Sequence, residues 1–560
     1  MNGSLVRPDP GWQSLSMGRS KVRKPKEAKP ASVPAAVQQM EIEALHGFID
    51  KAERGEPLTA EEAQALRATV STTAYLTSEI KRKRVSLQRL RNWLFGAPTE
   101  KTGRVCPPPP ATTPEAGSEP QAPGPKPKRK GHGRNPASCY RGAERVKVAH
   151  PDLSAGDPCP ECPKGKIYPM AEPATLIRVV GLAPLSAKRV ELDRYRCNCC
   201  DEIFKAPAPE GTGADKYDET ASSMVGSLRY GLGTPFFRLE KFQAGLGIPL
   251  PVGTQWKLVL RAAGLMEPAF DHLITWVAQS DVIHNDDTVM KLLDRPDLQR
   301  KGKQRKGVYT SGIIGKQGGH RVALFLTGMN HSGENLVEVL RRRREDLARP
   351  IQMCDALSAN TAGDLDTIVA HCLVHARRKF VEVADDFPDE CRFLLESLKA
   401  VYIHEAGTRG MSPEQRLALH QEQSAPVMDT IWAWLREQID GRQVEPKSGL
   451  GEAIAYMEKH WSRLTLFLRE PGAPIDNNLA ERILKRAILH RKNSLFYKTL
   501  AGARVGDLFM SLIHSAELNK VNPFDYLVAL QRYHALVEEN PEEWMPWNYA
   551  ATLEGLGLEA

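Results

Sequence analysis

The segment Glu470–Phe496, EPGAPIDNNLAERILKRAILHRKNSLF, holds an acid that could do chemistry, Glu481, among amides and cations. If this segment is a helix, steps of three and four residues put five polar residues on one side of it: Asn478, Glu481, Arg482, Lys485 and Lys492. The opposite, buried side holds Leu479, Ile483 and Ala487, and the Asn477–Asn478 pair can cap the helix. An acid among phosphate-binding groups indicates metal-dependent chemistry on nucleic acid. The alternative is a surface ion pair between Glu481 and Lys485, so the motif needs partners upstream.

The elements that precede this helix can supply those partners. Strands are predicted over DVIHNDDTVMKLL, GVYTSGIIG and HRVALFLTG, then a helix from Gly333 to Leu347, the short buried strand PIQMCD, and a helix from about Thr361 to Cys372. This order is expected of an RNase H-like core. In that core the acids of the first and fourth strands lie side by side, and a later helix can bring a third. These places are held by Asp286, Asp355 and Glu481.

Three converging carboxylates suit Mg²⁺ or Mn²⁺, because these hard cations prefer oxygen ligands and keep waters that a phosphate can replace. Two such ions activate an attacking hydroxyl and stabilise the leaving oxygen of an in-line phosphoryl displacement. Each acid taken alone is an ordinary surface residue. Together, in this element order, they predict a catalytic magnesium site.

Four cysteines form a second pattern with metal-ligand spacing. The pairs Cys159/Cys162 and Cys197/Cys200 each have two intervening residues. Thiolates at this spacing predict a closed tetrahedral Zn²⁺ site of the ribbon type, in which the metal stabilises a small module. Cys199 could replace Cys200 as a ligand. No position is left open for water, so the zinc is predicted to be structural.

Composition fits a multidomain protein that binds a polyanion. The chain has 560 residues, 41% of them hydrophobic, and a formal charge of +8. Its cations are bunched in four runs, at 81–84, 126–134, 300–306 and 341–344. Such clusters favour a nucleic-acid partner. The sequence has no apolar stretch of membrane-spanning length and no apolar core of a secretory signal near residue 1, which predicts a cytoplasmic location.

The organisation along the chain follows from shifts in composition and periodicity. We expect a multidomain α+β protein whose parts are a disordered basic tail (1–35), a helical zipper-like segment (36–96), a Pro/Gly-rich basic linker (97–137), a zinc-binding domain (138–208), a helical DNA-binding or docking unit (209–279), an RNase H-like catalytic core (280–515) with a helical insertion at about 385–468, and a helical C-terminal tail (516–560). The helical segment at 36–96 either forms a short coiled coil or packs on the protein's own core.

Three blocks of this chain resemble the transposases of the insertion sequence 66 family. They are HNDDTVMKLL, HCLVHARRKF at 371–380 and PIDNNLAERILKRAILHRKNSLF. LQRLRNWLFGAPTEK resembles that family's zipper-like segment, the cysteine module its zinc-binding domain, and NKVNPFDYL followed by MPWN its C-terminal tail. The resemblance extends over nearly all of the chain after residue 36.

The resemblance implies a DDE transposase that hydrolyses a phosphodiester at each element end and then joins the freed 3′-hydroxyl to target DNA. By position, Asp286, Asp355 and Glu481 are its three acids. The family usually has Asp-Glu-Thr where this chain has Asp286-Asp287-Thr288, and it commonly has Asp-Gly-Tyr where this chain has Asp355-Ala356-Leu357. Strand alternation lets only one of the two adjacent aspartates face the site, and the resemblance favours Asp286.

A Cys-x-x-His element, Cys372 to His375, resembles one that several transposases carry between their second and third acids. The alternative is a buried cysteine and a histidine that simply pack beside the site. We expect DNA contacts from His375, Arg377, Arg378, Lys379, Arg482, Lys485, Arg491 and Lys492.

The predicted partners are double-stranded DNA at the element ends and target, a second copy of the chain in a homodimer or higher oligomer, and companion proteins of the same element. The location implied is a bacterial cytoplasm, associated with the nucleoid. Two other functions fit the same residues. One is a zinc-containing DNA-binding protein without catalysis, and the other is a metal-dependent nuclease that cuts without joining.

Overall fold

The computed structural model describes residues 42–70, 102–105, 154–158, 160, 165–168, 184–196, 203–209, 215–294, 299–300, 303–304, 307–362 and 367–558. The predicted zinc ligands and most of the predicted tail, zipper and linker lie outside these residues, so those predictions are carried forward as predictions.

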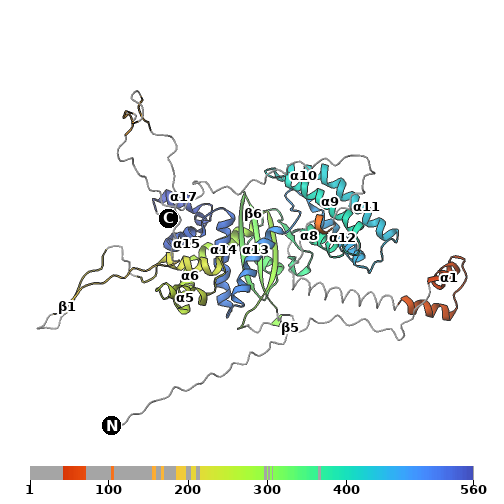
Figure 1. The fold of residues 1–560 in the computed structure, drawn as a ribbon, viewed down its shortest axis with the longest axis horizontal. Helices are drawn as coiled ribbons and strands as arrows, with labels where there is room; N and C mark the ends of the chain where they lie inside the picture. Colours follow the sequence, from red (N-terminus) through yellow and green to blue (C-terminus); the bar gives the residue numbers. More distant parts are fainter. Residues whose placement is uncertain are drawn as a thin grey trace, which may run out of the picture.

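A five-stranded mixed sheet lies at the centre of the molecule (Figure 1). Its strands are β3 (Val282–Met290), β6 (Val308–Gln317), β7 (His320–Gly328), β8 (Ile351–Cys354) and β9 (Ile368–His371). The order across the sheet is β7-β6-β3-β8-β9. The pairs β3/β6 and β6/β7 are antiparallel, whereas β3/β8 and β8/β9 are parallel. The predicted antiparallel strands and the buried strand before Asp355 are confirmed.

Two predicted helices differ from the structure. The helix expected from Thr361 to Cys372 is wrong, because Ile368–His371 forms the parallel edge strand β9. A short apolar run does not distinguish a strand from a helix by periodicity, and pairing with β8 decides the outcome. The helix α7 spans Ser332–Leu340 and does not continue to Leu347. Past its end the amides of Arg342 and Arg343 bond three residues back, to Val339 and Leu340, and the Arg343 side chain donates to the carbonyls of Ala278 and Ser280.

Helices cover the two faces of the sheet. Helix α6 (Val252–Ala278) lies against Gly315 of β6, where a Cβ atom would be 3.1 Å from Cα of Val277. Helix α13 (Asn478–Ser494) lies against Gly312, where a Cβ atom would be 3.1 Å from Leu484. Because residues three apart on a strand face opposite sides, these helices cover opposite faces. Both glycines permit close packing that a larger residue would prevent.

Helix α14 (Leu500–Leu518) follows the outer edge of β7 and satisfies its backbone. The amides of Thr327, Phe325 and Ala323 donate to side chains one helical turn apart, Asp507 at 2.6 Å, Ser511 at 2.9 Å and Ser515 at 3.1 Å. The spacing of these side chains along the helix matches the spacing of the amides along the strand, because four residues of helix rise about 6 Å and two residues of strand about 6.8 Å. An edge that could pair with another chain is thereby closed.

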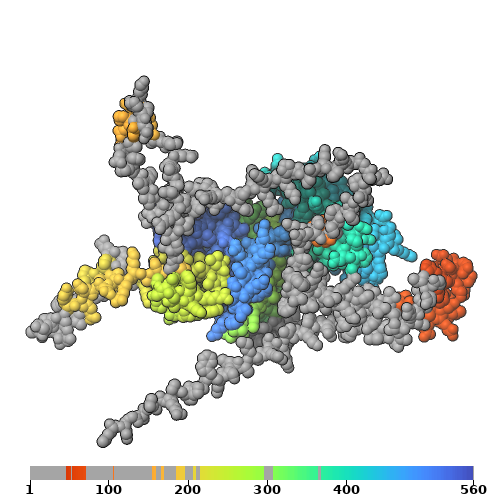
Figure 2. Space-filling view, viewed as in Figure 1, coloured from red at the N-terminus to blue at the C-terminus, as the bar shows by residue number. Residues whose placement is uncertain are grey.

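The helices at 217–279 are present as predicted, and they share one hydrophobic core with the sheet and the C-terminal helices. They are α4 (Glu219–Gly226), the π-helix η2 (Ser227–Gly231), α5 (Phe236–Gly245) and α6. The C-terminal helices are α15 (Pro523–Arg532), α16 (His534–Glu539), the 3₁₀-helix η6 (Pro541–Trp544) and α17 (Tyr549–Leu556). Figure 2 shows the yellow-green and blue segments packed together.

The helical insertion predicted at about 385–468 is confirmed as helical. After α8 (Leu373–Val381) it comprises α9 (Pro388–Gly407), α10 (Pro413–Leu419), the π-helix η4 (His420–Ser424), α11 (Ala425–Asp440), α12 (Gly449–Leu464) and the 3₁₀-helix η5 (Leu466–Leu468). These helices form a second hydrophobic core with β8 and β9 and extend from that edge of the sheet (Figure 1). The insertion therefore stands next to the strand ends that carry Asp355 and Cys372.

The other described elements are α1 (Ile42–Glu53), a helix over 60–70, α3 (Thr102–Val105), the pair β1 (Arg194–Arg196) and β2 (Ile203–Lys205), and the pair β4 (Gln299–Arg300) and β5 (Lys303–Gln304). A capping box precedes the 60–70 helix: the Thr59 amide donates to Glu62 at 2.9 Å, and the Glu62 amide donates to Thr59 at 3.2 Å. Within the described part of the chain, the helices are all too short or too polar to cross a bilayer.

Candidate active site

Sheet register brings together residues that are far apart in the sequence. In the parallel pairs, Val282 lies opposite Ile351, and Ile351 lies opposite Ile368. Four residues further along each strand, the same register puts Asp286 beside Asp355 and Asp355 beside Cys372. Side chains in one row of a parallel sheet point to the same face. The first two predicted acids therefore meet where the end of β8 lies beside the middle of β3, with a cysteine next in the row.

Asn360, in the 3₁₀-helix η3 (Ser358–Asn360), bridges the two carboxylates. Its Nδ2 lies 2.8 Å from Oδ1 of Asp355 and 3.4 Å from Oδ1 of Asp286. The Ser332 hydroxyl donates to Asn360 Oδ1 at 2.7 Å, which fixes the amide with its nitrogen toward the acids. Nothing in the sequence around this residue points to the role, since the contact depends on how the turn folds back over the strands.

The charges at this point repel one another. The pKa of Asp286 is raised to about 7, first by burial and then by the nearby charges of Asp355, Asp287 and Glu481, against a hydrogen bond from the Asp287 amide. Burial and like charges both disfavour an ionised carboxylate. A divalent cation among these groups would remove the repulsion, so the donor set fits the hard cation predicted for it.

The adjacent aspartates face different partners. Oδ2 of Asp287 accepts from Nδ1 of His331 at 2.7 Å and from the amide of Ser332 at 3.3 Å, at the start of α7. Asp286 lies instead beside Asp355 and Asn360. Of the two, Asp286 is thus the one that lies beside Asp355, while Asp287 contacts the start of α7.

Glu481 is positioned by the start of α13. Asn477 occupies the N-cap position, but its side chain does not cap the helix as expected. It accepts from Nδ1 of His284 at 3.1 Å and donates to the Asn285 carbonyl at 3.0 Å. Asp476 accepts from the Asn478 amide at 3.1 Å in its place. Because Glu481 is one turn after Asn477, these bonds hold the third acid close to β3.

Glu481 faces a cysteine and a histidine rather than a lysine. Oε1 of Glu481 lies 3.8 Å from Nε2 of His375, and the ligand atoms of Cys372, His375 and Glu481 all lie within 4.8 Å of one another. Among the ion pairs of the described residues, none joins Glu481 to Lys485. The surface ion pair considered from the sequence is therefore not formed here. On the side of α13 expected to be buried, Ile483 and Ala487 are in the core and Leu479 is half-buried against it.

The predicted DNA-binding residues fall into three groups. Those with exposed side chains are Lys379, Arg482, Lys485 and Lys492. Two others already bond to the protein: Arg377 donates to Thr102 Oγ1 at 3.3 Å, and Arg491 donates to Thr288 Oγ1 at 3.2 Å and to the Val289 carbonyl. His375 and Arg378 are half-buried on α8. The exposed group offers charge to a ligand, whereas Arg377 and Arg491 also support the fold.

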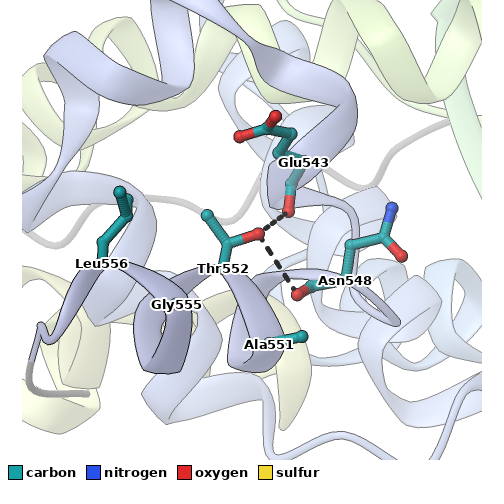
Figure 3. Close-up of a pocket in the computed structure, with 6 residues that line it drawn as sticks. All are labelled: Glu543, Asn548, Ala551, Thr552, Gly555 and Leu556. Carbon is teal, nitrogen blue, oxygen red and sulfur yellow. Dashed lines mark hydrogen bonds between the residues drawn. The ribbon is translucent and has the colours of Figure 1, made fainter.

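The basic run at 341–344 serves partly in packing. Arg342 pairs with Asp271 at 2.8 Å, and Arg343 donates to main-chain carbonyls. A hollow lies beside α17 (Figure 3), and its lining includes none of the three acids. There Thr552 Oγ1 donates to the Glu543 carbonyl at 2.8 Å, and Glu543 is the only ionisable side chain in its lining. The hollow thus lacks the convergent acids of the sheet edge.

Comparison with known proteins identifies the chain's relatives. Uncharacterized protein y4jD of Sinorhizobium fredii (strain NBRC 101917 / NGR234) is 27% identical over 420 residues, which are 70% of this chain and 78% of that protein. Uncharacterized protein y4hP of the same organism is 25% identical over 437 residues, 72% of this chain and 75% of that protein. The sequence model described as "Transposase IS66 family" matches residues 217–505, which include Asp286, Asp355 and Glu481. The chain therefore belongs to the IS66 family of transposases.

Proposed function

We propose that this transposase is of the DDE type: it binds the ends of its insertion sequence, cleaves the phosphodiester there with metal assistance, and joins the 3′-hydroxyl to target DNA. The observation that carries the proposal is the side-by-side placement of Asp286 and Asp355 under the amide of Asn360. The strand order β7-β6-β3-β8-β9 and the helical insertion support an RNase H-like core.

Asp286, Asp355 and Glu481 are the residues that would hold Mg²⁺ or Mn²⁺. The fit rests on the crowding that raises the pKa of Asp286 to about 7 and on Glu481 Oε1, which is buried without a hydrogen-bond partner. When bound, such ions supply activation of the attacking hydroxyl and charge stabilisation of the leaving oxygen. The protein's part is to orient the ligands, Asp355 and Asp286 through Asn360 and Glu481 through Asn477.

DNA binding is assigned to the exposed cations along α8 and α13. Lys379, Arg482, Lys485 and Lys492 supply phosphate contacts that hold the strand without reading its sequence. His375, beside Glu481, is placed to contact DNA near the scissile phosphate. The predicted zinc ribbon of Cys159, Cys162, Cys197 and Cys200 positions DNA or a partner subunit, with Zn²⁺ as its structural metal. A homodimer or higher oligomer and companion proteins of the element complete the proposed assembly.

A strand-transfer assay with Asp355→Asn tests this function. The substrate is a short duplex made from the DNA that flanks the gene, with Mg²⁺ present. Wild-type protein is expected to give joined products, and Asp355→Asn none. The matched control is Asp429→Asn, an exposed acid on α11 of the insertion, which should retain wild-type joining. Equal activity of wild type and Asp355→Asn would contradict the DDE assignment.

The same assay separates the two alternative functions. A nuclease without strand transfer would produce nicks and no joined product, although it would need the same three acids. A DNA-binding protein without catalysis would shift the duplex in a gel and produce neither. The crowded acids favour a catalytic protein, because burial of repelling carboxylates destabilises a fold that does not use them with a cation.

A further inference from the structure

Beside the three acids lies a second group of possible metal ligands. Cys372 precedes α8, His375 is on its first turn and Glu481 is on α13. One ligand atom from each residue lies within 4.8 Å of those of the other two. Glu481 thus belongs both to the acid triad and to this group, which we call the Cys-His-Glu cluster.

The backbone holds the cluster in place from both helices. The Asn477 amide donates to Sγ of Cys372 at 3.2 Å, and the Cys372 amide donates to the Cys354 carbonyl at 3.0 Å. Cys372 is only 1% exposed. The thiol therefore sits at the junction of β8, β9 and α13, with its sulfur directed toward the start of the helix that carries Glu481.

Two atoms of the cluster have unused hydrogen-bonding capacity. Glu481 Oε1 and His375 Nδ1 are buried and make no hydrogen bond in the described structure. The 3.8 Å between Glu481 Oε1 and His375 Nε2 is too long for a direct hydrogen bond. Buried polar atoms normally have partners, so the unpartnered Glu481 Oε1, which lies 3.8 Å from His375 Nε2, leaves a place for a ligand between these side chains.

The donor types select the class of that ligand. A thiolate and an imidazole favour Zn²⁺ and similar ions over Mg²⁺, which binds oxygen. Zinc bound by Cys, His and carboxylate has ligand bonds of about 2.0–2.3 Å, so its ligand atoms stand about 3–4 Å apart. The cluster is close to that spacing, and three protein ligands leave a fourth position open.

We propose that Cys372, His375 and Glu481 form a binding site for a zinc-class divalent cation, and that occupation of this site draws Glu481 away from Asp286 and Asp355. Cys372 releases its thiol proton to solvent when it binds. The binding site rests on the cluster's own geometry. Its consequence, inhibition of magnesium-dependent cleavage by zinc, rests on the proposed function.

Cobalt(II) binding to the full chain tests the site directly, because a thiolate ligand gives cobalt a charge-transfer absorption. The predicted ribbon cysteines will also bind cobalt, so the measurement is a difference between variants. Cys372→Ser should lose one equivalent of cobalt and its share of the thiolate absorption. The control Cys391→Ser, a buried cysteine on α9 outside the cluster, should keep both. Identical cobalt binding by wild type and Cys372→Ser would overturn the proposal.

A second variant covers the case in which Cys372→Ser fails to fold, as judged by near-ultraviolet circular dichroism. His375→Gln removes a less buried ligand, and it should lower the affinity for that same equivalent of cobalt by about tenfold or more. Unchanged affinity and unchanged visible bands in His375→Gln would overturn the proposal.

The regulatory consequence is tested by titrating zinc into the cleavage reaction at fixed Mg²⁺, with each protein normalised to its own activity without zinc. Cys372→Ser should need about tenfold more zinc than wild type for half-inhibition, and Cys391→Ser the same amount as wild type. Equal sensitivity of all three overturns the inhibitory role. Absence of any magnesium-dependent cleavage by wild type would count against the proposed function. The difference in cobalt binding between wild type and Cys372→Ser would still show whether the cluster binds a metal.

Discussion

The side-chain carbonyl of Asn477 accepts a hydrogen bond of 3.1 Å from the ring of His284, which joins the start of α13 to strand β3. Asn477 is one helical turn before Glu481, and His284 is two residues before Asp286 on the same face of the strand. This contact, between residues 193 positions apart, thus links the helix of the third acid to the strand of the first.

Replacing Asn477 with Ala should loosen this junction. The change leaves the buried His284 ring and the Asn285 carbonyl without their partner, which costs about 1–3 kcal/mol of unfolding free energy. Strand transfer should fall as well, because Glu481 is no longer held. Urea denaturation and the joining assay measure the two effects. Asn540→Ala, at an exposed position, should stay within about 0.5 kcal/mol of wild type and keep its activity.

The adjacent aspartates should separate chemistry from stability. Asp286→Asn should reduce joining by about 100-fold or more, because a metal ligand is lost. The folded pKa of Asp286 is about 7, above the usual 3.8, so its charge destabilises the metal-free fold above pH 4. The neutral amide should therefore raise metal-free stability at pH 8, by a gain on the order of 1–2 kcal/mol.

Asp287→Asn should show the opposite pattern. It weakens the contact with His331 and should lower stability by about 1–2 kcal/mol while retaining much of the activity. Thermal melts without metal and joining assays on both variants provide the comparison. If Asp287→Asn lost activity and Asp286→Asn kept it, the assignment of the first acid would be reversed.

Salt dependence should identify phosphate contacts on α13. Lys492 is exposed and in the last turn of the helix, so Lys492→Ala should weaken binding of the element end and reduce the slope of log K against log salt by about 1. Filter binding at several salt concentrations gives this slope. Lys447→Ala, in the exposed turn between α11 and α12, is the control and should leave the slope unchanged. Equal slopes for both variants would show that Lys492 does not contact DNA phosphates.

Buried neutral histidines, among them His284 and His490, should each lower stability in mild acid, with a sign opposite to the contribution of Asp286. Burial lowers the pKa of His284 to about 4 and of His490 to about 3, from 6.5. As pH falls below 6.5 the unfolded chain takes up protons that the folded chain does not, so the folded state loses stability, by about 1.4 kcal/mol per pH unit for each histidine at most. The loss is confined to the window between pH 6.5 and about 4 for His284 and about 3 for His490.

His490→Phe should reduce this dependence, since it keeps an aromatic ring between Tyr230 and Tyr497 and removes one imidazole. Urea denaturation between pH 6.5 and 4.5 gives the slope for each protein. Tyr230→Phe also alters the stack but removes no titrating ring in this range, and it should keep the wild-type slope. A His490→Phe slope equal to wild type would show that this histidine does not contribute.

The contact between α14 and β7 should protect the sheet edge. Ser511→Ala leaves the buried Phe325 amide without its acceptor at 2.9 Å, which costs about 1–3 kcal/mol. An exposed strand edge also promotes association between chains, so light scattering on mild heating should rise earlier than in wild type. Ser462→Ala, an exposed position on α12, should change neither quantity. No loss of stability in Ser511→Ala would mean that water replaces the hydroxyl.

The sequence by itself determined the elements and the residue types of the candidate site. Apolar and β-branched runs between polar turns marked β3, β6 and β8, with Asp286 inside β3 and Asp355 just after β8, because strand patterning is a local property. The helical period of α13 placed Glu481 on the side opposite Ile483 and Ala487 for the same reason. The family motifs supplied the link between these elements.

Only the tertiary structure decided which of these side chains meet. Pairing with β8 made residues 368–371 a strand, where the sequence predicted a helix. The register of β8 and β9 with β3 also put Cys372 in the row of Asp286 and Asp355. The contact of Asp287 with His331 and the bridge by Asn360 depend on turns that fold back over the sheet. Such contacts arise from packing between segments distant along the chain, and a local pattern does not encode them.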